Sequence, residues 1–129
     1  MRVSIRTVRA LVAAVVVAGG MTLVTVPSAS AAPAATCYGS AKSYASSGRD
    51  NLDWPGKGVA TTTSNCADIN VKPNQGTYVE TCFWTNNDWS CNGYRWIAAG
   101  TWGTAATDVL NGTEFFLHFD RSSSGLVAY

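Results

Sequence analysis

The single histidine of this chain, His118, lies two residues before Asp120, and this pair is the first candidate for catalysis. An imidazole beside a carboxylate is the usual arrangement of a general base, and serines that a base could activate are numerous. Alternate residues of an extended strand reach the same side without necessarily touching, however, and no serine lies in the setting of a nucleophile elbow. We therefore predict a chain with no catalytic residues that is not an enzyme.

Asp50 and Asp53 form a second candidate site, either as a carboxylate pair or as calcium ligands. The run Arg49-Asp50-Asn51-Leu52-Asp53 lacks the glycine and the distal glutamate of a calcium-binding loop, so we interpret it as a solvated loop. The sequence also lacks a glycine-rich motif that would cradle a phosphate. We expect neither a metal site nor a cofactor.

The four cysteines are Cys37, Cys66, Cys82 and Cys91, and an even number is typical of disulfides in an exported chain. Three pairings are possible. We favour Cys37–Cys66 with Cys82–Cys91, because these partners are nearest in sequence and the second bond would cross the base of one long loop. Zinc binding is the weaker interpretation, since no C-x-x-C pair exists and His118 lies far from the cysteines.

Three of the five tryptophans lie in or beside segments that we expect to be loops. Trp84 and Trp89 flank Thr85-Asn86-Asn87-Asp88, and Trp54 directly precedes Pro55. These three tryptophans are candidates for partner binding, either by stacking on sugar rings or as aromatic anchors of a protein interface; otherwise they fold back and cover the core. A disulfide beside the Trp84–Trp89 loop would stiffen it, and a preorganised loop loses less entropy on binding.

The elements that must position these residues are short strands. No segment beyond residue 31 carries a helical apolar stripe over three turns, whereas runs of Thr, Val, Tyr, Phe and Trp recur between Gly, Asn, Asp and Pro at intervals of about 8–12 residues. This pattern predicts an all-β fold, a single small disulfide-stapled antiparallel β-sandwich of about seven strands. The expected strands are Thr36–Ser43, Val59–Ser64, Asp68–Val71, Thr77–Trp84, Tyr94–Ala99, Gly103–Val109 and Glu114–Asp120, with an added edge strand at Leu126–Tyr129 and a loop at Ser46–Lys57.

Alternation within the strands predicts which side chains form the core. In Tyr94–Ala99 two alternations are possible, and we expect Trp96 rather than Ile97 to be buried. In Glu114–Asp120 the pattern is clear. There we expect Phe115, Leu117 and Phe119 to face inward, and Glu114, Phe116, His118 and Asp120 to face outward or towards an edge.

The segment Leu110-Asn111-Gly112 connects the last two long strands. A two-residue Asn-Gly turn would place Asp108 on the same face as Phe115, which is unsuitable for a core. A three-residue loop with a left-handed glycine pairs Val109 with Thr113 instead. We predict this bulged hairpin.

The first 31 residues have the organisation of a secretory signal peptide. Arginines precede an apolar run from Leu11 to Val26, and Ala29-x-Ala31 then fits an export peptidase. A membrane anchor is disfavoured because Gly19-Gly20 interrupts the apolar run and no charged stop-transfer segment follows. We therefore predict a secreted, extracellular protein with a signal peptide at 1–31 and a β-sandwich domain at 32–129.

Removal of this leader changes the charge of the chain. The leader contains three of the nine basic residues and none of the eight acidic ones, so the remaining domain has a formal charge near −2. No basic patch is visible in the sequence. This argues against nucleic acid or an anionic membrane as the partner.

Two stretches of the chain resemble a known family. The chain is similar to the small B component of the umbrella toxin particles of filamentous actinobacteria at Thr36-Cys37-Tyr38-Gly39-Ser40-Ala41-Lys42-Ser43-Tyr44 and at Thr61-Thr62-Thr63-Ser64-Asn65-Cys66-Ala67-Asp68-Ile69-Asn70. The resemblance implies an adaptor rather than a toxin enzyme. In that family the small subunit joins a lectin-bearing subunit of trypsin-like fold to repeats on a large toxin polypeptide, and the assembly inhibits competing bacteria.

The resemblance also implies where a partner would bind. The family uses an extended N-terminal segment in the cleft of the lectin-bearing subunit, and this segment maps here to the residues around Ala34–Ser43. Lys42 and Tyr44 are the candidate contacts.

We therefore expect a non-enzymatic adaptor subunit that binds other proteins within an antibacterial toxin particle. Two alternatives remain open. One is a secreted inhibitor of a hydrolase, either an amylase or a protease, with the Trp84–Trp89 loop as its inhibitory edge, although Tyr94-Arg95-Trp96 is the reverse of the amylase-inhibitor motif Trp-Arg-Tyr. The other is a small carbohydrate-binding module.

Overall fold

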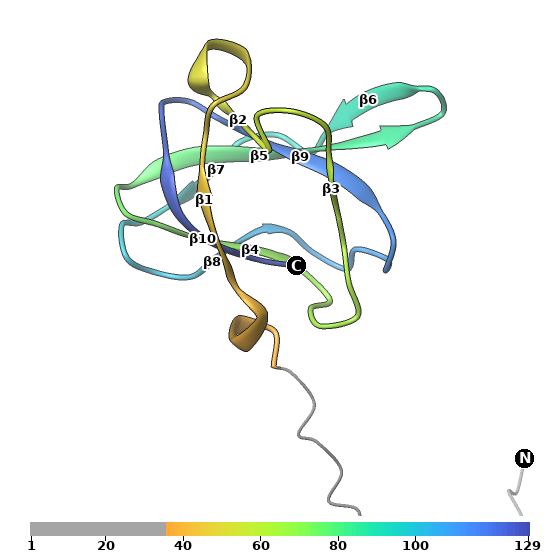
Figure 1. Cartoon of the computed structure of the whole chain (residues 1–129), viewed down its shortest axis with the longest axis horizontal. Coiled ribbons are helices and arrows are strands. Elements are labelled where there is room, and N and C mark those ends of the chain that lie inside the picture. The colour runs from red at the N-terminus through yellow and green to blue at the C-terminus, as the bar shows by residue number, and fades with distance from the viewer. Residues whose placement is uncertain (1–35) are drawn as a thin grey trace, which may run out of the picture. The chain divides into compact units, whose positions relative to one another are not determined.

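The computed structural model describes residues 36–129 (Figure 1). The predicted signal peptide lies outside the described residues. Within residues 36–129, no helix is both long enough and apolar enough to cross a membrane, and the helical structure consists of two 3-10 turns. The turns are η1 (Tyr38–Ser40) and η2 (Arg49–Asn51), and the strands are β1 (Lys42–Ala45), β2 (Asp53–Trp54), β3 (Ala60–Thr61), β4 (Ile69–Pro73), β5 (Thr77–Thr85), β6 (Asp88–Cys91), β7 (Arg95–Ile97), β8 (Gly103–Ala106), β9 (Glu114–Phe119) and β10 (Ser124–Ala128).

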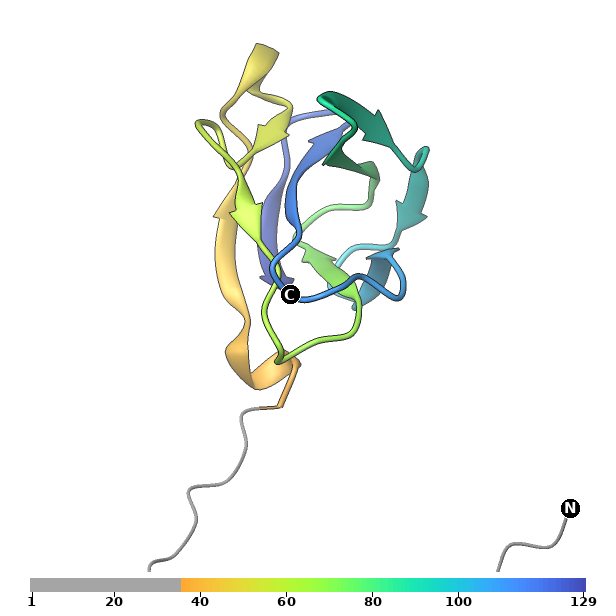
Figure 2. The same ribbon diagram turned by 90° about the vertical axis from the view of Figure 1, so that its right-hand side faces the viewer.

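These strands form two antiparallel sheets (Figures 1 and 2). The first sheet has the order β1-β10-β4-β8. The second has the order β2-β9-β5-β6, and β3 also pairs with β9 while β7 pairs with β5. The predicted fold, a small antiparallel β-sandwich stapled by disulfides, is confirmed.

The core lies between the two sheets. Phe115, Leu117 and Phe119 are fully buried, so the alternation predicted for β9 is confirmed. Tyr44 of β1 stacks on Phe119 from the other sheet, with ring centroids 5.2 Å apart. Each fully buried side chain of this size stabilises the fold by roughly 1.5–3 kcal/mol. The remaining fully buried aliphatic residues of the core are Ile69, Val71, Val79, Ala105, Val127 and Ala128.

The two disulfides join Cys37 to Cys66 and Cys82 to Cys91, which is the favoured pairing. The first ties the segment before β1 to the chain just before β4. The second links directly opposite residues of β5 and β6. All four cysteines are therefore used in cross-links.

The C-terminal strand lies inside its sheet, and the prediction of an edge strand there is wrong. β10 pairs with β1 on one side and with β4 on the other. Val127 lies opposite both Lys42 and Val71 and is fully buried. The short apolar sequence of β10 is therefore that of a central strand with one covered face.

The predicted bulged hairpin is also wrong, because β8 and β9 belong to different sheets. Instead of pairing with Thr113, Val109 donates its backbone N–H to the carbonyl of Ala67. Gly112 does adopt the expected left-handed conformation, with φ of 77°. Its N–H bonds the carbonyl of Thr62, so this connection crosses between the layers rather than folding back on one of them.

The expected burial of Trp96 is wrong as well. Trp96 is 54% exposed, whereas Ile97 is buried at 4% exposure. Trp96 lies opposite Tyr78 in the β5–β7 register, on the side of the sheet that faces away from the core. The Trp96 ring therefore packs against the Tyr78 ring outside the core.

Most strand boundaries differ by a few residues from the expected ones, and the structure contains two strands that were not expected. The first strand begins at Lys42 rather than Thr36, because Tyr38–Ser40 forms a 3-10 turn. β2 and β6 both lie in segments without an expected strand, and β6 exists through its pairing with β5. These strands are too short or too polar to be recognised by periodicity alone.

Candidate functional site

One side of the second sheet gathers aromatic side chains. β5 pairs in register with β6, β7 and β9, so alternate residues of these strands project together from the side opposite the core. Five of the nine exposed large apolar side chains among residues 36–129 lie on this side. Exposed apolar residues are usually scattered singly over a protein surface, so this gathering is unusual. We call this surface the aromatic face, and its rings are those of Tyr78, Trp84, Trp89, Tyr94, Trp96 and Phe116.

The rings form two clusters near opposite ends of β5. At one end Trp89 contacts Trp84 and Phe116, with ring centroids 5.2 and 4.8 Å away. At the other end Tyr78 contacts Trp96 at 5.0 Å. The ring planes of these three pairs are inclined by 66°, 73° and 61°, so contacting rings do not form a flat shelf.

The first cluster stands on the β5–β6 hairpin, which extends beyond the neighbouring strands (Figure 1). Asn86 and Asn87 form the turn at its tip, with φ of 52° and 63°. Positive φ at both central residues is the geometry that matches the twist of paired strands, and asparagine tolerates it. The disulfide between Cys82 and Cys91 cross-links the two strands of the hairpin, two residues along each strand from Trp84 and Trp89. The backbone that carries the tryptophan pair is therefore restrained, and we call this element the braced hairpin.

A polar centre lies between the clusters. Asp53 Oδ1 is 2.5 Å from His118 Nδ1, and both side chains are partly buried. Glu80 lies opposite His118 on the other flank of β9, so the three groups cross the sheet in a row. A cavity of about 170 Å³ opens beside them, lined by Arg49, Asp53, Glu80, Cys82, Cys91, Phe116 and His118.

The loop before β2 fixes the position of Asp53. The carbonyl of Asp53 accepts hydrogen bonds from the backbone N–H groups of Ser47 and Gly48, at 2.9 and 3.1 Å. A side chain at Gly48 would place its Cβ 2.6 Å from that of Asp53, so the close approach requires glycine. The loop that the sequence predicts at Ser46–Lys57 thus contains the short strand that presents the carboxylate to His118.

Negative charge gathers around the polar centre. The ring of Tyr94 lies 6.0 Å from that of His118. Burial is the main cause that raises the pKa of the Tyr94 hydroxyl, and the charges of Glu80, Asp120 and Asp53 raise it further. Three carboxylates therefore act on one exposed tyrosine.

Asp120 has a structural role at the margin of the face. Its Oδ1 accepts hydrogen bonds from the Thr77 hydroxyl and the Tyr78 N–H, at 2.8 and 3.0 Å. Arg121 donates to Oδ2, and this bond is the main cause that lowers the pKa of Asp120 to about 2. In the sequence, Asp120 was the candidate partner of His118. In the structure, the carboxylate that contacts His118 is that of Asp53.

Two of the predicted partner-binding residues, Trp84 and Trp89, lie on the aromatic face, at 46% and 38% exposure. Trp54 does not, because it is partly buried and packs against the core. Its ring lies against those of Phe115 and Tyr129. Trp54 therefore covers the core.

The two residues suggested by the family resemblance occupy different environments. Tyr44 is buried at 4% exposure, and its hydroxyl lies 2.8 Å from Ser123 Oγ. Lys42 is exposed, donates to the Tyr129 hydroxyl at 3.0 Å and lies over that ring. Lys42 is available to a partner, whereas the side chain of Tyr44 belongs to the core.

Glu80 and Phe116 were missing from the residues singled out for binding. The signal for Glu80 is present in the sequence, since Tyr78, Glu80, Cys82 and Trp84 alternate along one strand. The Phe116 ring reaches this surface because β5 pairs with β9. Alternation within a single strand does not predict that pairing.

The one group of metal-ligating residue types in the described part of the chain consists of Glu80, Cys82 and Cys91. Both cysteines are joined in a disulfide and have no thiolate to offer. A single carboxylate is left. This group does not form a metal site in the oxidised protein.

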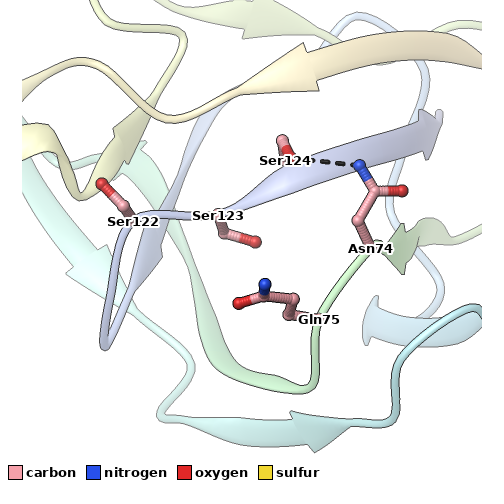
Figure 3. Close-up of a pocket in the computed structure, with 5 residues that line it drawn as sticks. All are labelled: Asn74, Gln75, Ser122, Ser123 and Ser124. Atoms are coloured by element: carbon pink, nitrogen blue, oxygen red, sulfur yellow. Dashed lines mark hydrogen bonds between the residues drawn. The ribbon is translucent and has the colours of Figure 1, made fainter.

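Two other hollows lie away from the polar centre. One, of about 290 Å³, is lined by Asn74, Gln75 and Ser122–Ser124, and the Asn74 amide donates to Ser124 Oγ at 3.1 Å (Figure 3). It contains neither a charged group nor an aromatic ring. The other, of about 330 Å³, is an open groove that includes Phe83 and the exposed Leu110. The groove has one ring and one carboxylate, those of Phe83 and Asp108, whereas the aromatic face has several of each.

Comparisons with family models, curated proteins and solved structures find no match to this chain.

Proposed function

We propose that this chain is a secreted, non-enzymatic adaptor that docks a protein partner on its aromatic face. The observation that carries the docking is the gathering of five exposed aromatic side chains on one side of a sheet, in a domain whose core is filled by other residues. By the resemblance at Thr36–Tyr44 and Thr61–Asn70, the proposed setting is an antibacterial toxin particle. There the chain would link a lectin-bearing subunit to a large repeat-containing toxin polypeptide.

Two features support export. The first 31 residues have the order of a signal peptide, with arginines, an apolar run and a small-residue exit. The domain also carries two disulfides, and such bonds persist in oxidising compartments outside the cytosol. A braced domain of this kind suits an extracellular assembly.

The inclination of the rings favours a protein partner over a sugar chain. Contacting rings meet at 61–73°, so a flat saccharide ribbon could not stack on both rings of a pair at once. Protein interfaces, by contrast, are anchored by tryptophan and tyrosine in contoured patches. The braced hairpin would also lower the entropy lost on docking.

The surroundings of His118 support a non-enzymatic function. The residues that line the cavity beside His118 and Asp53 include no serine or threonine, and the two cysteines among them form a disulfide. These residues therefore supply no hydroxyl or thiol for the histidine to activate. The pair acts instead as a fixed polar feature of the docking surface.

One observation supports the alternative function, that of a hydrolase inhibitor. The β5–β6 hairpin projects from the sheet with Asn86 and Asn87 at its tip (Figure 1). A rigid projecting loop is what an inhibitor would insert into the cleft of an amylase or protease. Mixing the purified domain with such enzymes decides this, because an inhibitor would abolish activity at an equimolar ratio and an adaptor would leave it unchanged.

The adaptor function is tested by purifying the native protein from the culture fluid of the bacterium that produces it. Size-exclusion chromatography with light scattering gives the mass of the assembly, and mass spectrometry identifies its members. We expect a stoichiometric complex that contains a lectin-bearing subunit and a large repeat-bearing polypeptide. Recovery of the chain only as a monomer would contradict the adaptor.

A further inference from the structure

Glu80 has no cationic partner at the centre of the aromatic face. Among residues 36–129, the ion pairs are His118 with Asp53 and Arg121 with Asp120. Glu80 is partly withdrawn from water, and its carboxylate makes no hydrogen bond within this part of the chain. A carboxylate in such a position is stabilised by an arriving cation.

We propose that the cavity beside Glu80 receives an arginine side chain of the protein partner. This inference rests on the proposed docking function and names the chemistry of the partner at its centre. The guanidinium would donate to the Glu80 carboxylate while its plane packs against the Phe116 ring. The two aromatic clusters would surround this contact and exclude water from it.

The size and lining of the cavity favour a single side chain. A second hollow, of about 230 Å³, shares the lining residues Arg49, Asp53 and Phe116 with this cavity of about 170 Å³. Each of the two is smaller than the roughly 300–1,000 Å³ of sites that hold whole small molecules. The cavity beside Glu80 combines an aromatic ring with a carboxylate, and guanidinium can use both, since it is planar, stacks on rings and binds carboxylates with two N–H groups. Lysine has a compact, strongly hydrated charge and would use the ring less well.

Arg49 lines the same cavity but does not occupy this role. It is exposed, and it lies beyond 4.0 Å from the carboxylate oxygens of both Glu80 and Asp53, since neither forms an ion pair with it. Asp53 is paired with His118, whereas Glu80 forms no ion pair with Arg49, nor with Lys57 of the hollow that shares Arg49 and Asp53. Glu80 is therefore the carboxylate of this cavity that is left for an arriving cation.

The test is an NMR titration of the ¹⁵N-labelled domain with blocked arginine dipeptide, at low ionic strength where exposed charges are least screened. The same peptide with citrulline in place of arginine is the control, because citrulline keeps the shape and lacks the charge. We expect arginine to shift the Trp89 indole N–H and the His118 ring signals, and citrulline to leave them unchanged. Equal shifts with both peptides, or none with arginine, would overturn the proposal.

A matched pair of variants locates the contact. Glu80→Gln removes the charge at the cavity, whereas Glu114→Gln removes an equivalent charge on the same side of β9 that does not line it. We expect Glu80→Gln to weaken arginine binding by about three- to tenfold, the range for an ionic hydrogen bond between partly buried groups, and Glu114→Gln to leave it within about twofold. Equal weakening by both variants would mean non-specific attraction and would overturn the site.

The outcome is separable from that of the docking function. If the native complex forms and its affinity is unchanged by Glu80→Gln, the arginine contact is wrong and docking on the face stands. If no complex exists but arginine binds at Glu80, the proposed function is wrong and the site remains. A titration with chitotetraose or cellotetraose completes the set, because sugar-induced shifts at the same indoles without an arginine response would assign the face to carbohydrate.

Discussion

Asp120 joins the start of β5 to the end of β9 by hydrogen bonds from Thr77, Tyr78 and Arg121. Because these bonds hold its pKa at about 2, below the ordinary carboxyl value, the ionised group stabilises the fold above about pH 4. That contribution is lost as the pH falls from about 4 to 2, where the folded protein also takes up the proton.

We expect Asp120→Asn to lower the free energy of unfolding by about 1 kcal/mol at pH 7, a modest value because Asp120 is exposed. At pH 2 the variant and the parent protein should be equally stable. Urea unfolding followed by tryptophan fluorescence at pH 7, 4 and 2 measures this. A difference that persists undiminished at pH 2 would show that the charge is not responsible.

Thr81 presents a different case, because its buried hydroxyl lacks a hydrogen-bond partner within residues 36–129. Thr81→Val keeps the shape of the side chain and removes the unsatisfied group. We expect the variant to be more stable by about 1 kcal/mol, since burying an unpaired hydroxyl is unfavourable. Thermal unfolding measures the change, and a lower melting temperature would mean that the hydroxyl is satisfied by a bound water.

At the scale of elements, the disulfide of the β5–β6 hairpin bears both on stability and on the proposed docking. Replacing Cys82 and Cys91 together by serine should lower the free energy of unfolding by about 2–3 kcal/mol, the value for a short loop in the chain-entropy model. The matched change at Cys37 and Cys66 should cost about 3–4 kcal/mol because it opens a longer loop. Calorimetry of both double variants measures these losses.

The two double variants should differ in binding. Opening the Cys82–Cys91 bond frees the arm that carries Trp84 and Trp89, so partner affinity should fall beyond what unfolding explains. The variant without the Cys37–Cys66 bond leaves that arm intact. Equal affinity of both variants below their melting temperatures would contradict a preorganised hairpin.

The central position of β10 also makes a testable claim. Removing residues 125–129 takes away the strand that joins β1 to β4 and exposes the side chains that it covers. We expect the shortened chain to lose its near-ultraviolet circular dichroism and its cooperative melt. A truncated protein that melts near the temperature of the full domain would mean that β10 is dispensable.

The sequence predicted what is local to one strand and missed what depends on pairing. The inward set Phe115, Leu117 and Phe119 follows from alternation within β9, a property of one segment. The register of β5 with β9 joins residues more than thirty positions apart, and nothing in either segment specifies it. For the same reason β2, which exists through its pairing with β9, was expected to be loop.

The site was predictable to the same extent. Trp84 and Trp89 were singled out because they flank an expected polar loop, and the structure places both on the aromatic face. The contact of His118 with Asp53 was not, since it joins strands whose neighbourhood depends on the whole sandwich. The sequence paired His118 with Asp120 and Asp53 with Asp50, because these residues are close along the chain. In the structure His118 and Asp53 contact each other instead.

At the scale of the whole molecule, the second sheet contributes one side of the core and carries the proposed docking surface on its other side. Its inner side is closed by the first sheet, and its outer side carries exposed rings around a polar centre. A domain of about 100 residues has a thin core, and the disulfides compensate for this.

The most direct test of this account is the affinity of the native partner for Trp89→Ala compared with Leu110→Ala, measured by biolayer interferometry. Both residues are exposed and apolar, but Leu110 lies off the aromatic face, so its loss controls for general effects. The account predicts that Trp89→Ala raises the dissociation constant by about thirtyfold or more, the loss typical of an interface anchor, and that Leu110→Ala leaves it within about twofold. Equal affinities for the two variants would contradict docking on the aromatic face.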